Sequence, residues 1–192
     1  MKDDIKGRST IWDQEKYIKA WNYASHAHIG QYMPGTEVPY INHIGNVAME
    51  VMSAIAETKS IGNPDLLVQC ALLHDTIEDT SSTYDDINET FGVDVADGVA
   101  ALSKDKSLPT KSEQMDDSIQ RILKQPLEIW MVKLSDRITN LQPPPAHWDK
   151  LKIEQYRNEA VFILNSLGEA DQFLADRLKS KINDYVQYYN LQ

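Results

Sequence analysis

The residues with the clearest chemical potential are one imidazole and three carboxylates in a single short stretch. His74 and Asp75 follow an apolar run over residues 66–73, and Glu78 and Asp79 come one helical turn later. Because residues four apart share a helix face, a continuous helix would bring Glu78 near His74 and Asp79 near Asp75. So much negative charge is unfavourable unless a cation neutralises it. The stretch therefore predicts a divalent metal site, although a solvated helix end also fits the pattern.

Two residues elsewhere in the chain are candidates for the same cluster. His43 follows a loop and opens a predicted helix, which is a typical rigid support for a functional group. Asp136 lies in the apolar segment 132–138, where a buried Asp needs Arg137, a helix cap or a metal as its partner. A surface Asp–Arg pair would explain Asp136 alone, but not the whole set. The candidate metal ligands are His43, His74, Asp75 and Asp136.

The chemistry of these side chains narrows the choice of metal. Two imidazoles and two carboxylates favour a first-row divalent ion such as Mn²⁺, Fe²⁺ or Zn²⁺ over Ca²⁺. The set contains no thiolate, which disfavours a closed structural zinc site. A centre of this kind would keep coordination positions open for water and a substrate.

The composition limits the classes of protein and partner. The 192 residues suit one domain with a sizeable core, and 42% hydrophobic and 25% charged residues are ordinary for a soluble globular protein. A net charge of −10 argues against nucleic-acid or anionic-membrane binding. No apolar run approaches the length of a membrane span, and residues 1–4 lack the apolar region of a signal peptide. Cys70 cannot form an internal disulfide, so we expect a cytoplasmic protein.

Helical periodicity and capping signals dominate the chain, and we predict an all-α fold, a single-domain helical bundle over residues 1–192. A short extended segment is possible at residues 38–41, and we find no internal repeat or linker. The helices are predicted at about residues 13–27, 42–57, from 64 through the acidic stretch, 83–92, 93–102, from 110, from 126 to 141, 148–167 and 169–189.

These residues carry a resemblance to a known family. The order of His43, then His74 and Asp75, then Asp136 resembles the pattern of the HD metal-dependent phosphohydrolases. The similarity is closer to the hydrolase domain of the RelA/SpoT family, and in particular to the stand-alone small alarmone hydrolases of the Mesh1 type. It spans about residues 17–167. The segments that carry it are residues 30–31, 39–43, 71–80, 91–92 and 133–141.

The resemblance implies a reaction and a role for each matching residue. The four candidate ligands would hold one Mn²⁺, and Glu78 and Asp79 would position or activate the attacking water. Asn140 matches a residue near the nucleoside sugar, and Lys152 and Tyr156 align with residues near the substrate phosphates. The implied activity is a Mn²⁺-dependent hydrolysis that removes the 3′-pyrophosphate of the nucleotide (p)ppGpp.

The chain departs from the family where the base is expected to pack. Family members usually carry an Arg or Lys shortly after a Gly-Gln pair, whereas here Tyr32, Met33 and Pro34 follow Gly30 and Gln31. Tyr32 could pack against a base, but an Arg can both stack on it and donate to guanine. Guanine and adenine nucleotides, (p)ppGpp and (p)ppApp, therefore both remain candidate substrates.

An anionic nucleotide must also approach an acidic protein. Two groups of basic residues could form a positive rim around the site: Lys104, Lys106 and Lys111, and Lys150 and Lys152. Two other functions are compatible with the sequence. One is hydrolysis of another phosphoester by an HD-type site, and the other is a catalytically silent alarmone-binding module.

Overall fold

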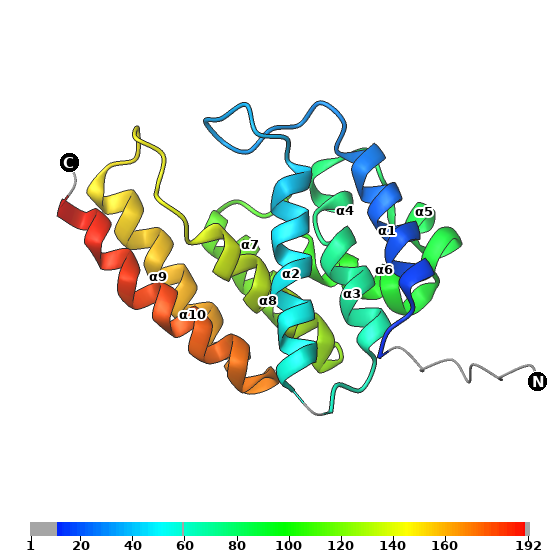
Figure 1. The fold of residues 1–192 in the computed structure, drawn as a ribbon. Coiled ribbons are helices and arrows are strands. Elements are labelled where there is room, and N and C mark those ends of the chain that lie inside the picture. The colour runs from blue at the N-terminus through cyan, green and yellow to red at the C-terminus, as the bar shows by residue number, and fades with distance from the viewer. Residues whose placement is uncertain (1–10, 59, 191–192) are drawn as a thin grey trace, which may run out of the picture.

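The computed structural model describes residues 11–58 and 60–190, and the predicted all-α fold is confirmed (Figure 1). In the described residues the only β-type pairing is an isolated bridge between Tyr32 and Pro39. Residues 1–4, which bear on the signal-peptide question, lie outside the described ranges. The helices are α1 (Gln14–Ala27), α2 (Ile41–Glu57), α3 (Pro64–Leu73), α4 (Thr76–Asp79), α5 (Tyr84–Phe91), α6 (Val93–Leu102), α7 (Lys111–Ile122), α8 (Leu127–Asn140), α9 (Lys150–Leu167) and α10 (Gln172–Asp184), with 3₁₀ turns η1 (Gly168–Ala170) and η2 (Tyr185–Asn190).

The helix starts follow the capping residues that the sequence contains. Asp13 caps α1 by accepting from the backbone N–H of Glu15. Thr83 opens α5 and Thr110 opens α7, each with a complete capping box. Pro64 occupies the first turn of α3, where its missing N–H costs nothing. These local signals explain why most predicted boundaries agree with the structure within two residues.

Helices α2, α3 and α8 pack against one another and form the centre of the molecule. All side chains of α3 from Leu66 to Leu73 are buried, and α8 is buried along most of its length, including its charged residues. Helices α9 and α10 cover one side of this centre, and α1, α5 and α6 lie on the other side (Figure 1). The three central helices carry the predicted metal ligands.

The prediction of one continuous helix through the acidic stretch is wrong. Helix α3 ends at Leu73, and Asp75 has backbone angles of φ −101° and ψ 0° before the short helix α4 begins. The hydroxyl of Thr76 donates to the carbonyl of Leu73 at 2.6 Å, a side-chain bond that competes with continued helix formation. Asp79 still donates its backbone N–H to the Asp75 carbonyl at 2.9 Å, so one turn separates the two carboxylates.

Two further expectations need correction. Residues 38–41 do not form a strand, because α2 already begins at Ile41 and only one bridge is present. The helix predicted over residues 169–189 is divided into η1, α10 and η2, since Asp171 adopts an extended conformation and caps α10 through the N–H of Leu174. In the described part of the chain, no helix has the length and apolar character needed to cross a membrane.

The close packing of α6 on the centre gives a testable prediction. A Cβ atom at Gly98 would lie 2.5 Å from Ile129 Cδ1 and 2.9 Å from Cys70 Sγ, so Gly98→Val overpacks the core. We expect a loss of about 1–3 kcal/mol in the free energy of unfolding, or about 2–4 °C in Tm for each kcal/mol. The control is Gly45→Ala, whose Cβ would meet Trp21 at an ordinary 3.5 Å. Equal thermal stability of the two variants would contradict this packing.

Candidate metal centre and active-site pocket

Three buried side chains from the three central helices converge on one point. His43 comes from α2, His74 from the end of α3 and Asp136 from α8, and their candidate ligand atoms lie within 4.8 Å of one another. The two Nε2 atoms are 3.2 Å apart, and Asp136 Oδ1 lies 3.4 Å from that of His43 and 3.9 Å from that of His74. The structure therefore brings together three of the four predicted ligands as one compact cluster.

The hydrogen bonds on the far side of each ring fix the tautomers that we assign. His74 Nδ1 lies 2.8 Å from the carbonyl of Ala71, to which it must donate. His43 Nδ1 faces the hydroxyl of Thr139 at 3.4 Å, and that hydroxyl already donates to the Asp136 carbonyl, so it accepts from the ring. When neither Nε2 carries a proton, the lone pairs of the two rings face each other beside a carboxylate. This donor set fits a divalent cation.

The electrostatics of the cluster support the same conclusion. Burial by itself favours a neutral imidazole, but hydrogen bonds to Asp136 and Asp75 raise the pKa of His43 to about 9. The pKa of His74 is also raised, against its burial, by the charge of Asp75. Burial opposes ionisation of Asp136, yet the charge of Lys133 and the hydrogen bond with His43 hold its pKa well below the usual range. The site therefore attracts positive charge strongly.

Asp75 lies beside both imidazoles but outside the compact group of three. Its Oδ2 is 3.0 Å from His74 Nε2 and 3.6 Å from His43 Nε2. The same oxygen accepts from the hydroxyl of Tyr40 at 2.6 Å, which directs the carboxylate toward the rings. Burial and the adjacent Asp75 raise the pKa of Tyr40 far above its ordinary value, so Tyr40 remains a donor. Asp75 as a ligand remains a prediction.

The partners of Asp136 are not Arg137, which the sequence analysis considered as its partner. Lys133, buried on the same face of α8, donates to Asp136 Oδ2 at 3.0 Å, and Asn140 donates to Oδ1. Arg137 makes no such pair, and instead donates through Nη2 to Glu159 at 3.3 Å. Sequence reasoning missed Lys133, although a lysine three residues before Asp136 on one helix was a usable signal.

The acidic pair Glu78 and Asp79 is held by the loop that follows α6. Glu78 Oε2 accepts from the backbone N–H of Lys104 at 2.8 Å. The Lys106 ammonium donates to Asp79 Oδ1 at 2.9 Å and to the Glu78 carbonyl at 2.7 Å. From the other direction, the Gln31 amide donates to the Asp79 carbonyl at 2.6 Å. The two carboxylates are therefore oriented by groups from two separate loops.

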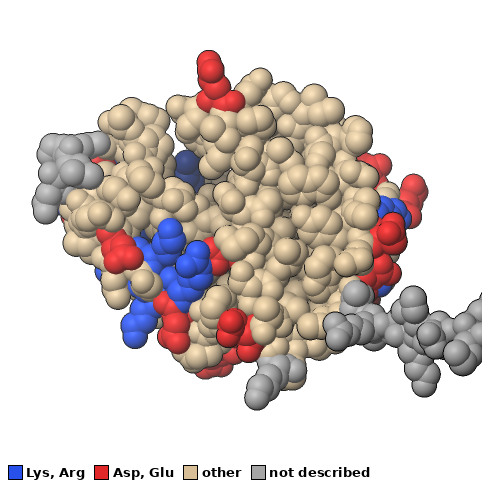
Figure 2. Space-filling model, viewed as in Figure 1, with Lys and Arg blue, Asp and Glu red and all other residues tan. Residues whose placement is uncertain are grey.

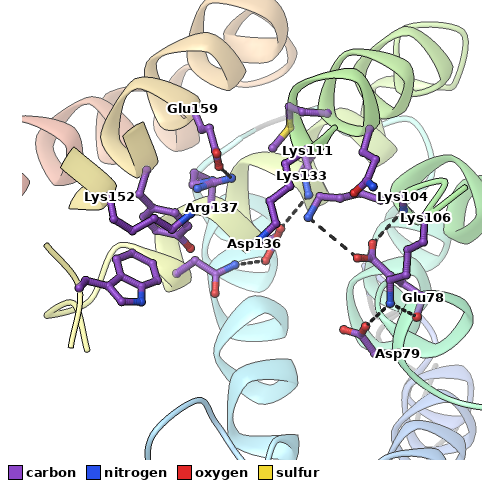
Figure 3. Close-up of a pocket in the computed structure, with 15 residues that line it drawn as sticks. Glu78, Asp79, Lys104, Lys106, Lys111, Lys133, Asp136, Arg137, Lys152 and Glu159 are labelled. Atoms are coloured by element: carbon purple, nitrogen blue, oxygen red, sulfur yellow. Dashed lines mark hydrogen bonds and ion pairs between the residues drawn. The ribbon is translucent and has the colours of Figure 1, made fainter. Parts of the chain in front are cut away.

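The acidic pair, Asp136 and many basic groups border one pocket of about 670 Å³ (Figure 3). Six basic and four acidic side chains line it, so the pocket has an excess of positive charge in a protein of net charge −10. The lining residues are Glu78, Asp79, Lys104, Lys106, Lys111, Gln114, Met115, Lys133, Asp136, Arg137, Asn140, Trp148, Lys152, Tyr156 and Glu159.

Most of the residues predicted to contact a substrate lie in this pocket. Asn140, Lys152 and Tyr156 line it, but Lys150 does not. Tyr32 does not line it either, and its side chain is 57% exposed. Trp148 was not predicted to contribute, although its ring meets that of Tyr156 edge-on at 5.0 Å. The expected positive rim is thus formed by the basic residues of α7, α8, α9 and the loop after α6.

This arrangement is suited to hydrolysis of a phosphate ester. The His–Asp cluster, which borders the pocket through Asp136, could bind a cation that activates water, the acidic pair could accept a proton, and the basic wall could bind the phosphate.

Comparison with known proteins gives a consistent result. The model of the HD domain family matches residues 20–170. The mouse guanosine-3′,5′-bis(diphosphate) 3′-pyrophosphohydrolase MESH1 is 32% identical over 168 residues, covering 84% of this chain and 90% of the mouse protein. The human MESH1 is 31% identical over 168 residues, which cover 84% of this chain and 90% of the human protein.

Solved structures share the fold. The structure of a metazoan SpoT orthologue, described as hydrolysing ppGpp and having a role in starvation responses, superposes with a TM-score of 0.75 and 26% identity, covering 95% of this chain and all of that one. The lmo0812 protein of Listeria monocytogenes superposes with a TM-score of 0.60 and 26% identity over 78% of this chain and 99% of its own. The chain therefore belongs to the HD domain family and, within it, to the Mesh1-type 3′-pyrophosphohydrolases.

Proposed function

We propose that the protein is a Mn²⁺-dependent hydrolase that removes the 3′-pyrophosphate from alarmone nucleotides, (p)ppGpp and also (p)ppApp, with residues 1–192 as one HD hydrolase domain. The observation that carries the proposal is the shared pocket, which is lined by the acidic pair, by the basic wall and by Asp136, the member of the His–Asp cluster that reaches it. The mouse and human relatives are named for this reaction on the guanosine nucleotide.

The metal ligands in this proposal are the two imidazoles and the two aspartates. Mn²⁺ accepts such a mixture of nitrogen and oxygen donors. A divalent ion bound there would supply Lewis-acid activation of water and of the phosphoryl group. Lys133 favours the ionised form of Asp136, and the hydrogen bonds from Asn140 to Asp136 and from Tyr40 to Asp75 orient the two carboxylates. The proposed ligands are His43, His74, Asp75 and Asp136.

In the proposed reaction, water attacks the phosphorus that is attached to the ribose 3′ oxygen. The bond between this phosphorus and the 3′ oxygen breaks. Glu78 accepts the water proton. Its carboxylate lines the pocket, and the backbone N–H of Lys104 holds it in place through Oε2. Asp79, fixed by Lys106, orients the same water. The departing 3′ oxygen takes up a proton, so that ppGpp and water give GDP and pyrophosphate.

The remaining pocket residues would bind the rest of the nucleotide. Asn140 donates to Asp136 and lines the pocket, which supports its proposed contact with the sugar. Lys152 and Tyr156 on α9 provide a cation and a hydroxyl for phosphate oxygens. Tyr32 belongs to the loop that Gln31 joins to Asp79, which supports a role at the base although Tyr32 lies outside the pocket.

The proposal is tested by incubating purified protein with Mn²⁺ and a panel of nucleotides. We expect pyrophosphate release from ppGpp and ppApp. We expect none from GDP or ATP, which carry no pyrophosphate on the 3′ oxygen. Release of phosphate from nucleoside 5′-monophosphates would favour a different HD-type activity. Binding of ppGpp without turnover would favour an alarmone-binding module.

The first prediction concerns the metal. In His74→Ala the Nε2 ligand is lost, and we expect bound Mn²⁺ and hydrolysis to fall together to background while the helical bundle stays folded. Metal analysis, turnover and circular dichroism measure the three properties. The matched control is His26→Ala, because this exposed imidazole bonds only to the carbonyl of Asn22 in its own helix. Full metal occupancy in His74→Ala would exclude the proposed ligand set.

The second prediction concerns the acid pair. Glu78→Gln keeps the hydrogen bond from Lys104 but cannot accept a proton, so we expect kcat to fall on the order of 10²-fold or more with Mn²⁺ still bound. Glu89→Gln is the control, since Glu89 is exposed on α5 and lies outside the pocket. If both Glu78→Gln and Asp79→Asn turned over substrate at the normal rate, the acidic pair would have a structural role and no catalytic one.

The third prediction concerns the base. Residues 29–42 contain no Lys or Arg, and stacking alone discriminates weakly because every base has a π-face. The groups proposed to act on the phosphates and sugar are independent of the base. We therefore expect ppGpp and ppApp to be hydrolysed with kcat/KM values closer together than in a relative with the basic residue. A guanine preference above roughly 10³-fold in parallel kinetics would contradict this, because one or two ordinary hydrogen bonds supply less.

A further inference from the structure

His28 is a buried imidazole whose two nitrogens have very different surroundings. The residue follows the last turn of α1 and is only 3% exposed. Its Nδ1 lies 2.7 Å from the side-chain oxygen of Gln31, whereas Nε2 has no hydrogen-bond partner among the described residues. An unpaired buried polar atom is unfavourable, and an apolar side chain of similar shape would avoid that cost. Packing of the bundle therefore does not account for an imidazole at this position.

The amide of Gln31 joins His28 to the acidic pair, and only one orientation of this amide makes both bonds. Its nitrogen donates to the backbone carbonyl of Asp79 at 2.6 Å. A carbonyl can only accept, so the amide oxygen must face His28, and Nδ1 must carry the proton that this oxygen receives. If the amide turned over, its oxygen would face the Asp79 oxygen. The Nδ1–H group of His28 therefore favours the orientation of Gln31 that holds Asp79.

Asp79 needs such outside contacts because its own helix is very short. Helix α4 has four residues, and an isolated helix of this length is unstable in water. Lys106 binds the Asp79 carboxylate at 2.9 Å, but its side chain is 59% exposed, and exposed ion pairs hold their partners weakly. Gln31 binds the Asp79 carbonyl from the other direction and is itself bonded to a buried ring. The contact through Gln31 is therefore the better fixed of the two.

The loop that carries Gln31 has no charged donor with which to hold an acid. It projects from the end of the bundle where α1 ends and α2 begins (Figure 1). Residues 29–42 contain no Lys or Arg, and Figure 2 shows no basic side chain on the visible side of this loop. The loop is closed by backbone bonds, among them one from the Tyr40 N–H to the Gln31 carbonyl at 2.9 Å. It reaches Asp79 through a neutral amide, whose direction must be set by a neighbour.

We infer that His28 is a positioning residue for the hydrolysis: its Nδ1–H group orients the Gln31 amide, which fixes Asp79 and thereby the attacking water. The inference rests on the proposed function for the role of Asp79. His28 does not line the pocket, so it acts through Gln31 rather than on the substrate. Its ring also packs against that of Tyr40, with centres 5.1 Å apart, and Tyr40 supports Asp75. A test must therefore separate the hydrogen bond from the packing.

Two substitutions of nearly equal shape make this separation. Asn places an amide nitrogen at about the position of Nδ1, and Leu places a methyl group there. In His28→Leu we expect kcat for ppGpp to fall about 10- to 100-fold, the range for loss of an outer-shell partner. KM should stay within about threefold, because Asp79 is proposed to act on the water and not on binding. His28→Asn keeps the donor, so its kcat should stay within about threefold of wild type.

A double variant tests whether the effect passes through Gln31. Gln31→Leu should lower kcat at least as much as His28→Leu does. Adding His28→Leu to Gln31→Leu should lower kcat less than about twofold further, because residues that act through one another are not additive. The matched control is His26→Leu, which removes an exposed imidazole of α1 that bonds to the Asn22 carbonyl. This control should turn over ppGpp like wild type.

Two measurements do not depend on turnover. NMR of the imidazole nitrogens in the full chain, before paramagnetic Mn²⁺ is added, should place the His28 proton on Nδ1. Metal analysis of His28→Leu should show normal Mn²⁺ content, because the Tyr40 contact is kept by an apolar side chain.

Several outcomes would overturn the inference. These are a His28 proton on Nε2 alone, loss of Mn²⁺ in His28→Leu, normal kcat in His28→Leu, and equal losses in the Leu and Asn variants. Full additivity with Gln31→Leu would also overturn it. Failure of the proposed function would instead appear as absent turnover of ppGpp by wild-type protein, and the NMR measurement would still decide whether His28 orients Gln31.

Discussion

The structure depends on one electrostatic constraint at its centre. Packing of α2, α3 and α8 places two imidazole nitrogens 3.2 Å apart beside a buried carboxylate. A buried charge is costly unless it is paired, and here the pairing extends outward from Asp136 to Lys133, Asn140 and the two rings. The core that brings these groups together also shields them from water. The hydrophobic packing that stabilises the bundle therefore also strengthens the electrostatic attraction between this cluster and a cation.

The basic residues of the pocket have two roles that depend on each other. Lys104 and Lys106 hold the acidic pair in place through a backbone N–H and an ammonium group. The same side chains belong to a wall whose positive charge opposes the net charge of −10 carried by the whole chain. A polyanion approaching the protein is repelled by most of the surface and attracted to this opening. The loop after α6 therefore positions the acidic pair and also contributes to the positive charge of the pocket.

Much of the fold could be predicted from the sequence because local rules determine it. Capping residues such as Thr83 and Thr110 mark helix starts whatever the tertiary context, and the observed boundaries agree. The break at Asp75 was missed because it comes from a side-chain bond of Thr76 to the preceding turn, which leaves no trace in hydrophobic periodicity. The divided C-terminal helix has a similar cause, since the extended backbone of Asp171 is not visible in the apolar pattern.

Some residues of the candidate site could also be predicted from the sequence, and others could not. His43, His74 and Asp136 could be predicted because their residue types are chemically distinctive, and the structure places them together. Arg137 could not be predicted, because α8 is buried on almost every face and a basic residue on such a helix has no polar side to indicate its direction. Lys133 was missed, although its position three residues before Asp136 on one helix indicated the pair. Their partners come from α8 itself for Lys133 and from α9 for Arg137.

The loop that precedes α2 contacts the candidate site through two side chains, Tyr40 at Asp75 and Gln31 at Asp79. The Gln31 side chain donates through its amide nitrogen to the Asp79 carbonyl, and its amide oxygen lies 2.7 Å from His28 Nδ1. These bonds hold the loop at Gln31 without help from the side chains of residues 32–34. Tyr32 is 57% exposed, and its side chain makes no contribution to the pocket wall. A residue in that position can be exchanged without moving the acid pair or the metal-binding cluster. If this loop binds the base, as we propose, base preference could change by substitution at Tyr32, while the groups proposed to act on phosphate are held by the buried helices and by the loop after α6.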